Sequence, residues 1–364
     1  MSKAGDFSQK FRERYFKRKR IDLECEVITP MFLGNADGEA EWRAEPFKAL
    51  LRFWWRVAHG QQTPYASNGY KELAKQEGAL FGTAAEDADA ASGRSLVTVG
   101  VEGLSESVKN PFDNNLRVPY PKKAMPQVNP LLYLGGMGLM QPNAKPKHSY
   151  FPPGASFRLS LTFPDHLAET TSRLIAFLQA FGAVGSRSRN GWGSFQISPG
   201  RPLPFISTNR ASEILKEATI DWKKGFEKDY PNCLGKDGAP LLWKTAPVSR
   251  WEEAMRSLAD AYIAVRAKEV AGIKWLDPNN GERHLLGIPL THHNPTQPSR
   301  YASPLRFVVR KKNKEYLGVV LHLPQSFPEN KSKLSAPDQK KVWETKIHKK
   351  LDKRLQRASY EECL

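Results

Sequence analysis

Arginine and aromatic side chains crowd two short segments of the sequence, and both have spacings that suit the binding of an anion. In the first, residues 47–59, cationic side chains recur four positions apart, and residues at that spacing share one side of an α-helix. The expected polar side carries Lys48, Arg52, Arg56 and His59, with Trp55 at its edge. Like charges at this spacing oppose helix formation by roughly a few tenths of a kcal/mol each, and no acidic residue occurs from 46 to 71 to offset them. The pattern predicts phosphate contact by this face, although a solvated helix face has the same composition.

A glycine-rich segment, residues 182–193, is the second candidate. Its four glycines allow positive φ angles and a close approach of the backbone to a ligand, and exposed N–H groups in such loops form anion-binding concavities. Arg187 and Arg189 add positive charge, and Trp192 offers a ring for stacking. The segment lacks the Gly-Lys-Ser/Thr sequence of a Walker loop. It predicts an anion-binding turn, and a simple tight turn is the alternative.

A third group of residues lies nearer the C-terminus and is less specific. Residues 283–289 and 300–305 flank the pair His292 and His293, and Arg300 adds a cation. Adjacent side chains point to opposite sides of an extended chain, so the two histidines are poorly placed to chelate one metal. One of them could act as a general acid or base near neutral pH, but exposed polar positions or nucleic-acid contacts are the preferred interpretation.

Apolar alternation and turn signals predict the elements that must position these segments. Strands are expected at residues 21–28, 95–101, 155–163 and 194–198, and helices at 47–59 and at 165–181, the second one capped by Asp165. The order β-α-β-β-α-β is typical of ferredoxin-like (RRM-like) domains. The sequence thus predicts a first domain over residues 21–204.

This first domain contains a loop-rich insert at about residues 102–154. It holds nine prolines and the Gly-Gly-Met-Gly cluster at 135–138. Loops of this length inside a compact domain are usually functional or disordered. The insert is therefore either a surface excursion or a finger that reaches a ligand or a neighbouring subunit.

The second half of the sequence predicts another α+β domain, over residues 205–330, although it shows no visible repeat of the pattern of the first domain. Ser249 and Glu252 have the spacing of a capping box before a helix that runs to about Val270. Strands are expected at 285–290, 304–309 and 316–323, the last two joined by a polar turn. The expected fold class is α+β, with two tandem ferredoxin-like domains.

Basic segments flank these domains, at residues 1–20 and at 331–364, the latter as a helix or a tail. Seven Lys or Arg residues fall between 10 and 20, and ten between 331 and 357. Such runs are either solvated faces or attract phosphates without reading a sequence.

The overall composition indicates which class of partner these cations serve. The chain of 364 residues has 55 Lys and Arg against 38 Asp and Glu, a net charge of +17, with 9 Trp, 11 Tyr and 18 Phe. Such a chain favours a polyanion, nucleic acid before an anionic membrane. No stretch approaches the roughly 18 consecutive apolar residues of a membrane span, and residues 1–10 are polar, unlike a secretion signal. Cys25, Cys233 and Cys363 lie far apart, which argues against a disulfide framework or a zinc knuckle and for a reducing cytoplasm.

Several motifs occur along the first half in a characteristic order. They are Thr-Pro-Met-Phe-Leu-Gly at 29–34, Arg43, Phe-Lys-x-x-Leu-Arg-Phe-Trp-Trp-Arg at 47–56, Leu-Phe-Gly at 80–82 and Gly-Ser-Arg-Ser-Arg-x-Gly-x-Gly at 185–193. Together they resemble the RAMP superfamily of CRISPR effector proteins, and within it the first-numbered RAMP subunits of type III-B (Cmr) complexes. The resemblance covers about residues 20–200, and segments at 287–289 and 300–304 are similar but less diagnostic. Asn35 replaces the second glycine that is usual in the family after 33–34.

The resemblance implies two RRM-like domains in tandem, with the glycine loop on the family's guide-binding surface. It implies a place at the head of the complex, near the 3′ end of the guide RNA and opposite the 5′ part of the target RNA. Such a subunit packs against other RAMP subunits and is not regarded as the nuclease.

The residues and the resemblance together predict a non-catalytic RNA-binding subunit without cofactor or metal. Phosphate contacts and base stacking are expected from Arg43, Lys48, Arg52, Trp55, Arg56, Arg187, Arg189, Trp192 and Arg300. The expected partners are CRISPR guide RNA, target RNA and other RAMP subunits, and not a membrane. The main alternative is a metal-independent RAMP endoribonuclease that cuts CRISPR repeat RNA with His59, His292 or His293 as general acid or base. A scaffold whose basic ends neutralise acidic neighbours is a third interpretation.

Overall fold

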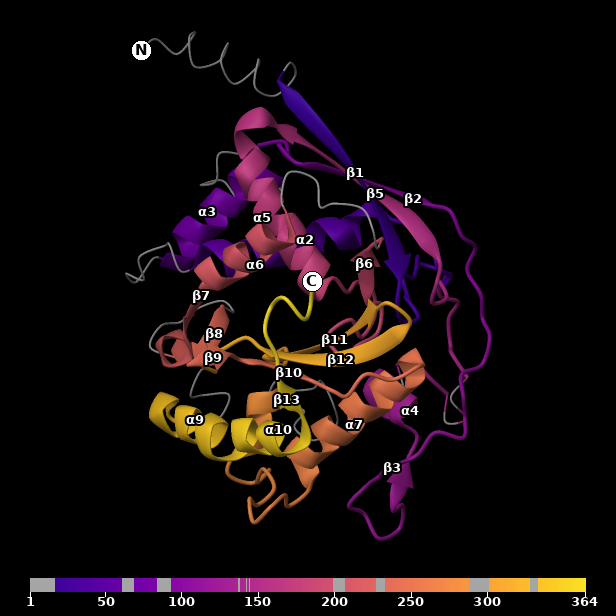
Figure 1. Ribbon diagram of the computed structural model, residues 1–364, viewed down its shortest axis with the longest axis vertical. Coiled ribbons are helices and arrows are strands. Elements are labelled where there is room, and N and C mark those ends of the chain that lie inside the picture. The colour runs from indigo at the N-terminus through magenta and orange to yellow at the C-terminus, as the bar shows by residue number, and fades with distance from the viewer. Residues whose placement is uncertain are drawn as a thin grey trace.

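Two four-stranded antiparallel sheets with their helices make up the body of the molecule (Figure 1). The computed structural model describes residues 17–60, 69–83, 93–136, 138–141, 143, 145–198, 207–226, 233–287, 301–327 and 333–364. Cations predicted at positions 10, 12 and 14 lie outside the described residues, as does the segment 288–300 with Arg300, His292 and His293.

The first sheet has the strand order β2-β5-β1-β6. Its strands are β1 (Arg18–Val27), β2 (Thr98–Gly103), β5 (Ser156–Pro164) and β6 (Phe195–Ile197), and its helices are α2 (Ala44–His59), α3 (Gly69–Phe81), α5 (Ala168–Phe181) and α6 (Thr208–Glu217). The predicted alternation in β1 is confirmed, because Ile21, Leu23, Cys25 and Val27 are buried while the residues between them are exposed or half-buried. Helices α2 and α5 pack against each other and against this sheet.

The start of the second helix differs from the sequence prediction. A short 3-10 turn, Asp165–Leu167, precedes α5, and the N-cap residue is Leu167, whose side chain makes no capping bond. Asp165 instead pairs through Oδ1 with Nζ of Lys19 at 2.5 Å. The predicted cap is wrong because a cross-strand cation competes for that carboxylate.

The second sheet has the strand order β11-β12-β10-β13. It consists of β10 (Leu242–Lys244), β11 (Leu305–Lys312), β12 (Glu315–His322) and β13 (Gln356–Arg357), with α7 (Trp251–Ala267), α9 (Ala336–Val342), the π-helical η5 (Trp343–His348) and α10 (Lys349–Arg354). Along the chain these elements repeat the β-α-β-β-α-β order of the first unit, and the four strands are arranged in the same spatial order. The C-terminal segment thus contributes helices and a strand to this unit, and Trp343 and Ile347 are buried in it.

Two predictions for the second half are wrong. Arg250 is the N-cap residue of α7 and makes no side-chain capping bond, so Ser249 and Glu252 do not form a capping box. The predicted strand at 285–290 begins instead as a 3-10 turn, Glu282–Leu286. The hairpin of β11 and β12 is confirmed, with Asn313 at a φ of 58° in its polar turn.

The insert at 102–154 runs along one side of the molecule and reaches α7 (Figure 1). It contains the short strands β3 (Val118–Pro119) and β4 (Gln127–Val128) and the helix α4 (Pro130–Gly135). Helix α4 packs against α7 and buries Leu131 and Leu134. A small third sheet, β7 (Thr219–Asp221), β8 (Leu234–Asp237) and β9 (Ala239–Pro240), links the two halves.

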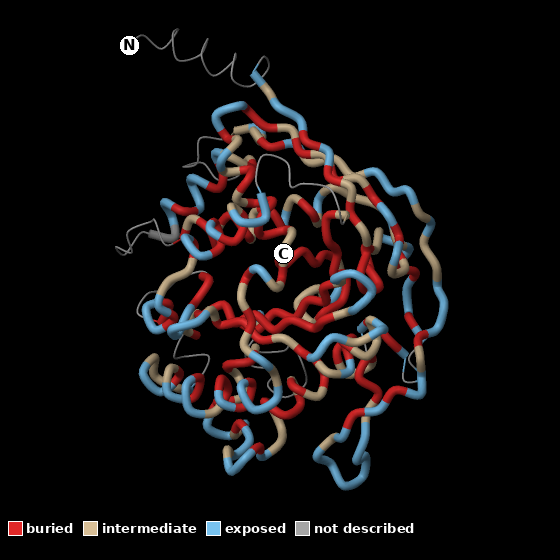
Figure 2. Tube along the Cα trace, in the orientation of Figure 1, coloured by how far each residue is buried: buried red, intermediate tan, exposed pale blue. Residues whose placement is uncertain are grey.

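Buried residues follow both sheets and the helices that cover them (Figure 2). Five tryptophans, Trp54, Trp192, Trp222, Trp243 and Trp343, are among the largest fully buried side chains. All three cysteines are buried and free, and burial raises the pKa of the Cys233 and Cys363 thiols to about 12. Within the described part of the chain, no helix has the length and apolar character that crossing a membrane requires.

The two sheets meet where the edge strands β6 and β11 lie side by side. Gln196 exchanges two hydrogen bonds with the backbone of Lys311, and the buried guanidinium of Arg310 donates to the carbonyls of Phe195 and Gly182, at 2.5 and 3.0 Å. Phe307 N–H donates to the carbonyl of Arg189 at 2.8 Å. These bonds fix the glycine loop 182–193 between the two units.

Candidate functional site

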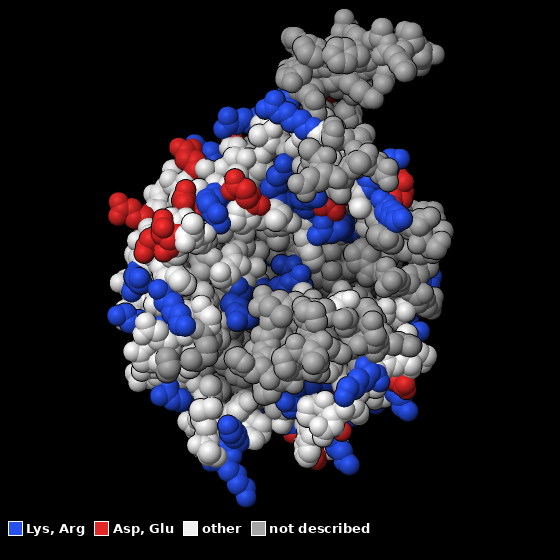
Figure 3. All heavy atoms as spheres, turned by 180° about the vertical axis from the view of Figure 1, so that it is seen from behind, with Lys and Arg blue, Asp and Glu red and all other residues white. Residues whose placement is uncertain are grey.

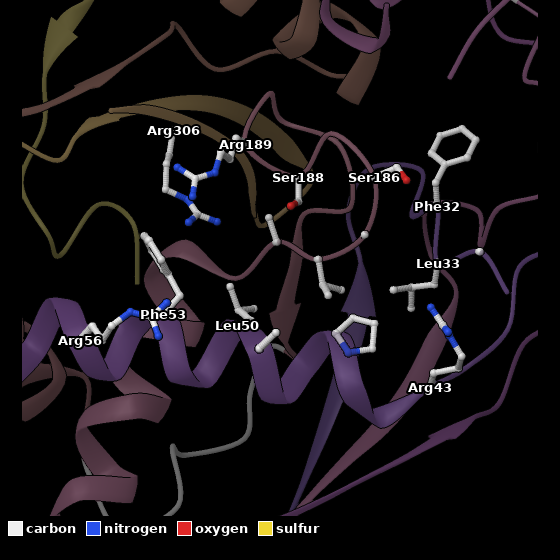
Figure 4. A pocket seen from close by; sticks show the side chains of 16 residues that line it. Phe32, Leu33, Arg43, Leu50, Phe53, Arg56, Ser186, Ser188, Arg189 and Arg306 are labelled. Atoms are coloured by element: carbon white, nitrogen blue, oxygen red, sulfur yellow. The ribbon is translucent and has the colours of Figure 1, made fainter. Parts of the chain in front are cut away.

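An open groove of about 530 Å³ lies where α2, the glycine loop and β11 meet. Arg43, Leu50, Phe53 and Arg56 of α2 and its N-cap form one wall (Figure 4). The loop contributes residues 183–186, 188 and 189, the turn at 32–34 closes one end, and Arg306 reaches in from β11. Four arginines, Arg43, Arg56, Arg189 and Arg306, therefore surround a partly apolar floor.

Helix α2 lines the groove with one of its sides, while its other two sides pack against the core and against α3. Phe47, Leu51 and Trp54 pack in the core, where Trp54 stacks on Phe177 of α5 at a ring-centroid distance of 5.2 Å. The groove residues follow a second stripe at spacings of three and four, as expected for one side of a helix. A third side, with Arg52, faces α3.

The predicted basic ridge on α2 is divided between two of these sides. Glu77 of α3, only 5% exposed, accepts hydrogen bonds from Nε of Arg52 at 2.5 Å and Nη1 of Arg56 at 2.6 Å. The expectation that no acid offsets these like charges is wrong, because the carboxylate comes from another helix. Arg56 still lines the groove, whereas Arg52 does not.

Three other residues predicted on this ridge also lie away from the groove. Lys48 lies on the opposite side of α2, and burial, with a smaller contribution from Arg52, lowers the pKa of its ammonium group. Trp55 is only 2% exposed, and the His59 ring stacks on it at 4.7 Å. Trp55 therefore presents no open ring face to a base, and the stacking role predicted for it is wrong.

The glycine loop is a closed structural turn rather than an open anion-binding concavity. Gly185 has a φ of 94°, and a Cβ there would lie 2.5 Å from the carbonyl oxygen of Phe32; at Gly193 it would lie 1.9 Å from that of Val184. The N–H groups of Ser186, Ser188 and Asn190 donate to carbonyls of the protein itself. The glycines thus allow close packing of backbone on backbone, which is a different use from the ligand approach that the sequence suggested.

The side chains of this loop divide between the groove and the core. Arg189 lines the groove, donates to the carbonyl of Ser303 at 3.2 Å, and places its guanidinium carbon 5.5 Å from the Phe53 ring centroid. Arg187 is exposed, and its guanidinium lies beside Gly136 of the insert rather than in the groove. Trp192 is fully buried against Phe32 and Trp251, so it cannot stack on a bound base as predicted.

Arg306 is the groove residue that sequence reasoning missed. It is 4% exposed and lies over two aromatic rings of α2, with Cζ 4.4 Å from the Phe53 centroid and 5.0 Å from that of Trp54. The residues next to it in β11, Leu305 and Phe307, are apolar. A cation within an otherwise apolar strand was the sequence signal from which this residue could have been predicted.

The electrostatics of the groove are those of a site for an anion. Burial lowers the pKa of Arg306 to about 9, assisted by the nearby charge of Arg189, and burial and Arg56 lower that of Arg189. The described lining residues include two serines and four arginines but neither a carboxylate nor a histidine. Seen from behind, Lys and Arg side chains lie over the surface and inside a central recess (Figure 3). No cluster of three or more His, Cys, Asp or Glu side chains suited to a metal ion occurs among the described residues.

The fold and the groove together define an α+β protein with two antiparallel sheets and a cationic groove at their seam, which confirms the coarse fold-class prediction. Residues 24–196 match the model of the RAMP superfamily. The predicted resemblance to this superfamily is therefore confirmed, and it covers α2 and the glycine loop.

One solved structure has a similar fold over most of the chain. Apo Cmr1 from Pyrococcus furiosus has a TM-score of 0.53 and 21% sequence identity, with 94% of this chain and 98% of that chain covered. The type III-B Cmr-beta complex bound to cognate target RNA contains a chain with a TM-score of 0.43 and 12% identity, covering 84% and 94%. No curated protein matches the sequence.

Proposed function

We propose that this chain is a non-catalytic RNA-binding subunit of a type III-B CRISPR (Cmr) ribonucleoprotein in antiviral defence. The observation that carries the proposal is the convergence of four arginines on one open groove, formed by the RAMP-like helix and loop together with the second sheet. Guanidinium groups hold phosphates and position a strand without reading its bases. The fold shared with Cmr1 supports a place in that type of complex.

The proposal includes the finer architecture and partners. The repeated element order and strand order of the two sheets support two tandem ferredoxin-like domains. We assign the groove to guide RNA near its 3′ end or to the 5′ part of target RNA, with sequence read by base pairing between the two. Other RAMP subunits are the protein partners, and the complex acts in the cytoplasm.

Binding rather than cleavage is the role that the groove supports. General acid–base cleavage of RNA needs a titrating group within hydrogen-bond reach of the scissile phosphate. Arginine does not exchange its proton near neutral pH, and His59 stacks on Trp55 outside the groove.

The test is ultraviolet crosslinking of the purified chain to single-stranded guide and target RNA, with the crosslinked peptides identified by mass spectrometry. Crosslinks are expected to the peptide that holds Phe53, because its half-buried ring faces the groove. Crosslinks confined to residues remote from α2, β11 and the glycine loop would refute this assignment.

A cleavage assay distinguishes the proposed binding role from the alternative, a metal-independent endoribonuclease. Labelled CRISPR repeat RNA incubated with the chain and EDTA is expected to remain intact. A defined product that is lost on a single His→Ala substitution would establish the endoribonuclease instead. Pull-down of neighbouring subunits after RNase treatment reports whether the chain acts only as a scaffold.

A further inference from the structure

A buried arginine without a carboxylate partner is unusual, and Arg306 is such a residue. Its side chain is almost fully buried, its Nε has no hydrogen-bond partner, and no ion pair to it occurs among the described residues. The other buried arginine of the same strand, Arg310, also has an Nε without a partner, but both of its terminal nitrogens donate to backbone carbonyls. Arg306 is therefore distinguished from its neighbour by where its charge points, which is into the groove (Figure 4).

The surroundings of Arg306 do not neutralise it. The nearest described charges are cationic, since Arg189 and Arg56 approach the same end of the groove, and the carboxylate of Glu77 is occupied by Arg52 and Arg56. The rings of Phe53 and Trp54 stabilise the cation through their π faces. Removal of a charge from water nevertheless costs free energy that only a counter-charge with good hydrogen-bonding geometry recovers.

We infer that Arg306 and Arg189 form a subsite for one phosphate group at the seam between the two sheets. The inference rests on the proposed function, because it specifies which group of an RNA strand the deep end of the groove holds. Each guanidinium offers paired N–H donors in a plane, which match two oxygens of a phosphate. Both guanidinium carbons lie over the same Phe53 ring, at 4.4 and 5.5 Å from its centroid, so one phosphate above that ring can contact both.

The subsite is divided between the two units of the fold. Arg189 belongs to the glycine loop beside the first sheet, and Arg306 belongs to β11 of the second. The hydrogen bond from Phe307 N–H to the Arg189 carbonyl fixes the backbones of the two arginines side by side. A phosphate held by both side chains would therefore connect the two sheets and stabilise the folded chain.

The first experiment measures thermal unfolding of the full chain in inorganic phosphate, against chloride of the same ionic strength. The wild-type Tm is expected to rise with phosphate concentration to saturation, and that of Arg306→Met to lack this saturable rise. Arg187→Met removes the same charge from an exposed position of the loop and is expected to respond like the wild type. Because phosphate also stabilises folded proteins through exclusion from their surface, the saturable difference between the variants is the decisive quantity.

The second experiment measures urea unfolding without phosphate. Arg306→Met is expected to unfold at a higher urea concentration than the wild type, because an apolar side chain replaces an uncompensated buried charge. Its affinity for single-stranded RNA is expected to fall by roughly five-fold at about 0.1 M salt, the contribution of one phosphate contact.

The outcomes separate this inference from the proposed function. Equal phosphate responses in the wild type and Arg306→Met would overturn the subsite, as would a midpoint in urea that is unchanged or lower. RNA binding could persist in either case through Arg43 and Arg56. If the chain responds to phosphate but binds no RNA, the subsite remains as a site for an adventitious ion only or for a different phosphate ligand. The same result would refute the proposed function.

Discussion

Arg43 and Lys48 provide the sharpest test of which side of α2 meets RNA. They lie five residues apart in the sequence, and each carries one positive charge. Arg43 lines the groove, whereas Lys48 lies on the opposite side of the helix. Arg43→Ala and Lys48→Ala therefore change the net charge of the protein equally and differ only in the side from which the charge is lost.

The expected magnitude follows from the number of cations in the groove. Four arginines line it, and each phosphate contact with a single strand contributes about 0.7 to the slope of log K against log salt, so the full slope is at most about 2.8. Such a slope reduces affinity by roughly 50-fold between about 50 and about 200 mM salt. Loss of one contact in Arg43→Ala lowers the slope by about 0.7 and the affinity at about 0.1 M salt by roughly five-fold.

The assay is fluorescence anisotropy of a labelled oligouridine, titrated with each variant at several salt concentrations. Oligouridine forms little structure of its own, so the measured slope reports protein contacts. Lys48→Ala is expected to retain the wild-type slope, apart from a small uniform decrease in affinity from its distant charge. The same comparison applies in the loop, where Arg189→Ala is expected to lower the slope and Arg187→Ala is not. A Lys48→Ala effect equal to that of Arg43→Ala would refute the groove as the site.

Three further predictions concern the scaffold that holds the groove. Arg310→Met removes two buried charge-assisted hydrogen bonds, those to the carbonyls of Phe195 and Gly182, and is expected to lower the free energy of unfolding by roughly 2–4 kcal/mol, which urea unfolding measures; a neutral effect would show that the seam does not depend on this residue. Burial lowers the pKa of His348 to about 3 and, with the neighbouring His348, that of His322 well below its usual value. Below about pH 6.5 the unfolded chain therefore binds more protons than the folded chain, so the free energy of unfolding is highest above that pH. His348 lowers it by about 1.4 kcal/mol per pH unit between about pH 6.5 and pH 3, and His322 acts in the same direction. His348→Gln is expected to reduce this dependence, and an unchanged pH profile would contradict it. Gly193→Ala places a Cβ 1.9 Å from the carbonyl oxygen of Val184 and is expected to prevent stable folding. Gly154 has a φ of 85° and no atom within 4 Å of a Cβ built on it, so Gly154→Ala is expected to lower the free energy of unfolding by only about 1–2 kcal/mol. Equal Tm values for the two variants would contradict the reasoning.

Local pattern was sufficient for most elements of the first unit. The alternation in β1 and the apolar stripe of α2 are properties of a few adjacent residues, and burial of one side follows from them directly. The hairpin of β11 and β12 was predicted for the same reason, because its strands hold short apolar runs on either side of a polar turn. The caps at 165 and 249 were predicted wrongly because a cap depends on competing partners, such as Lys19, that come from elsewhere in the chain.

The sequence alone therefore identified a basic helix and a glycine-rich turn as candidates for anion binding, and it indicated the RAMP resemblance that the family model confirms. Only the tertiary structure decided which cations face the groove. Helix α2 has neighbours on three sides. Glu77 of α3 forms an ion pair with Arg52 on one side, and Arg306, which is distant in sequence, lies over the Phe53 ring on another. The same packing buries Trp55 and Trp192, whose chemistry suits stacking on bases but whose large apolar rings gain more from the core. Periodicity assigns a residue to a side of its own element, whereas the partner on that side is supplied by contacts between residues distant in sequence.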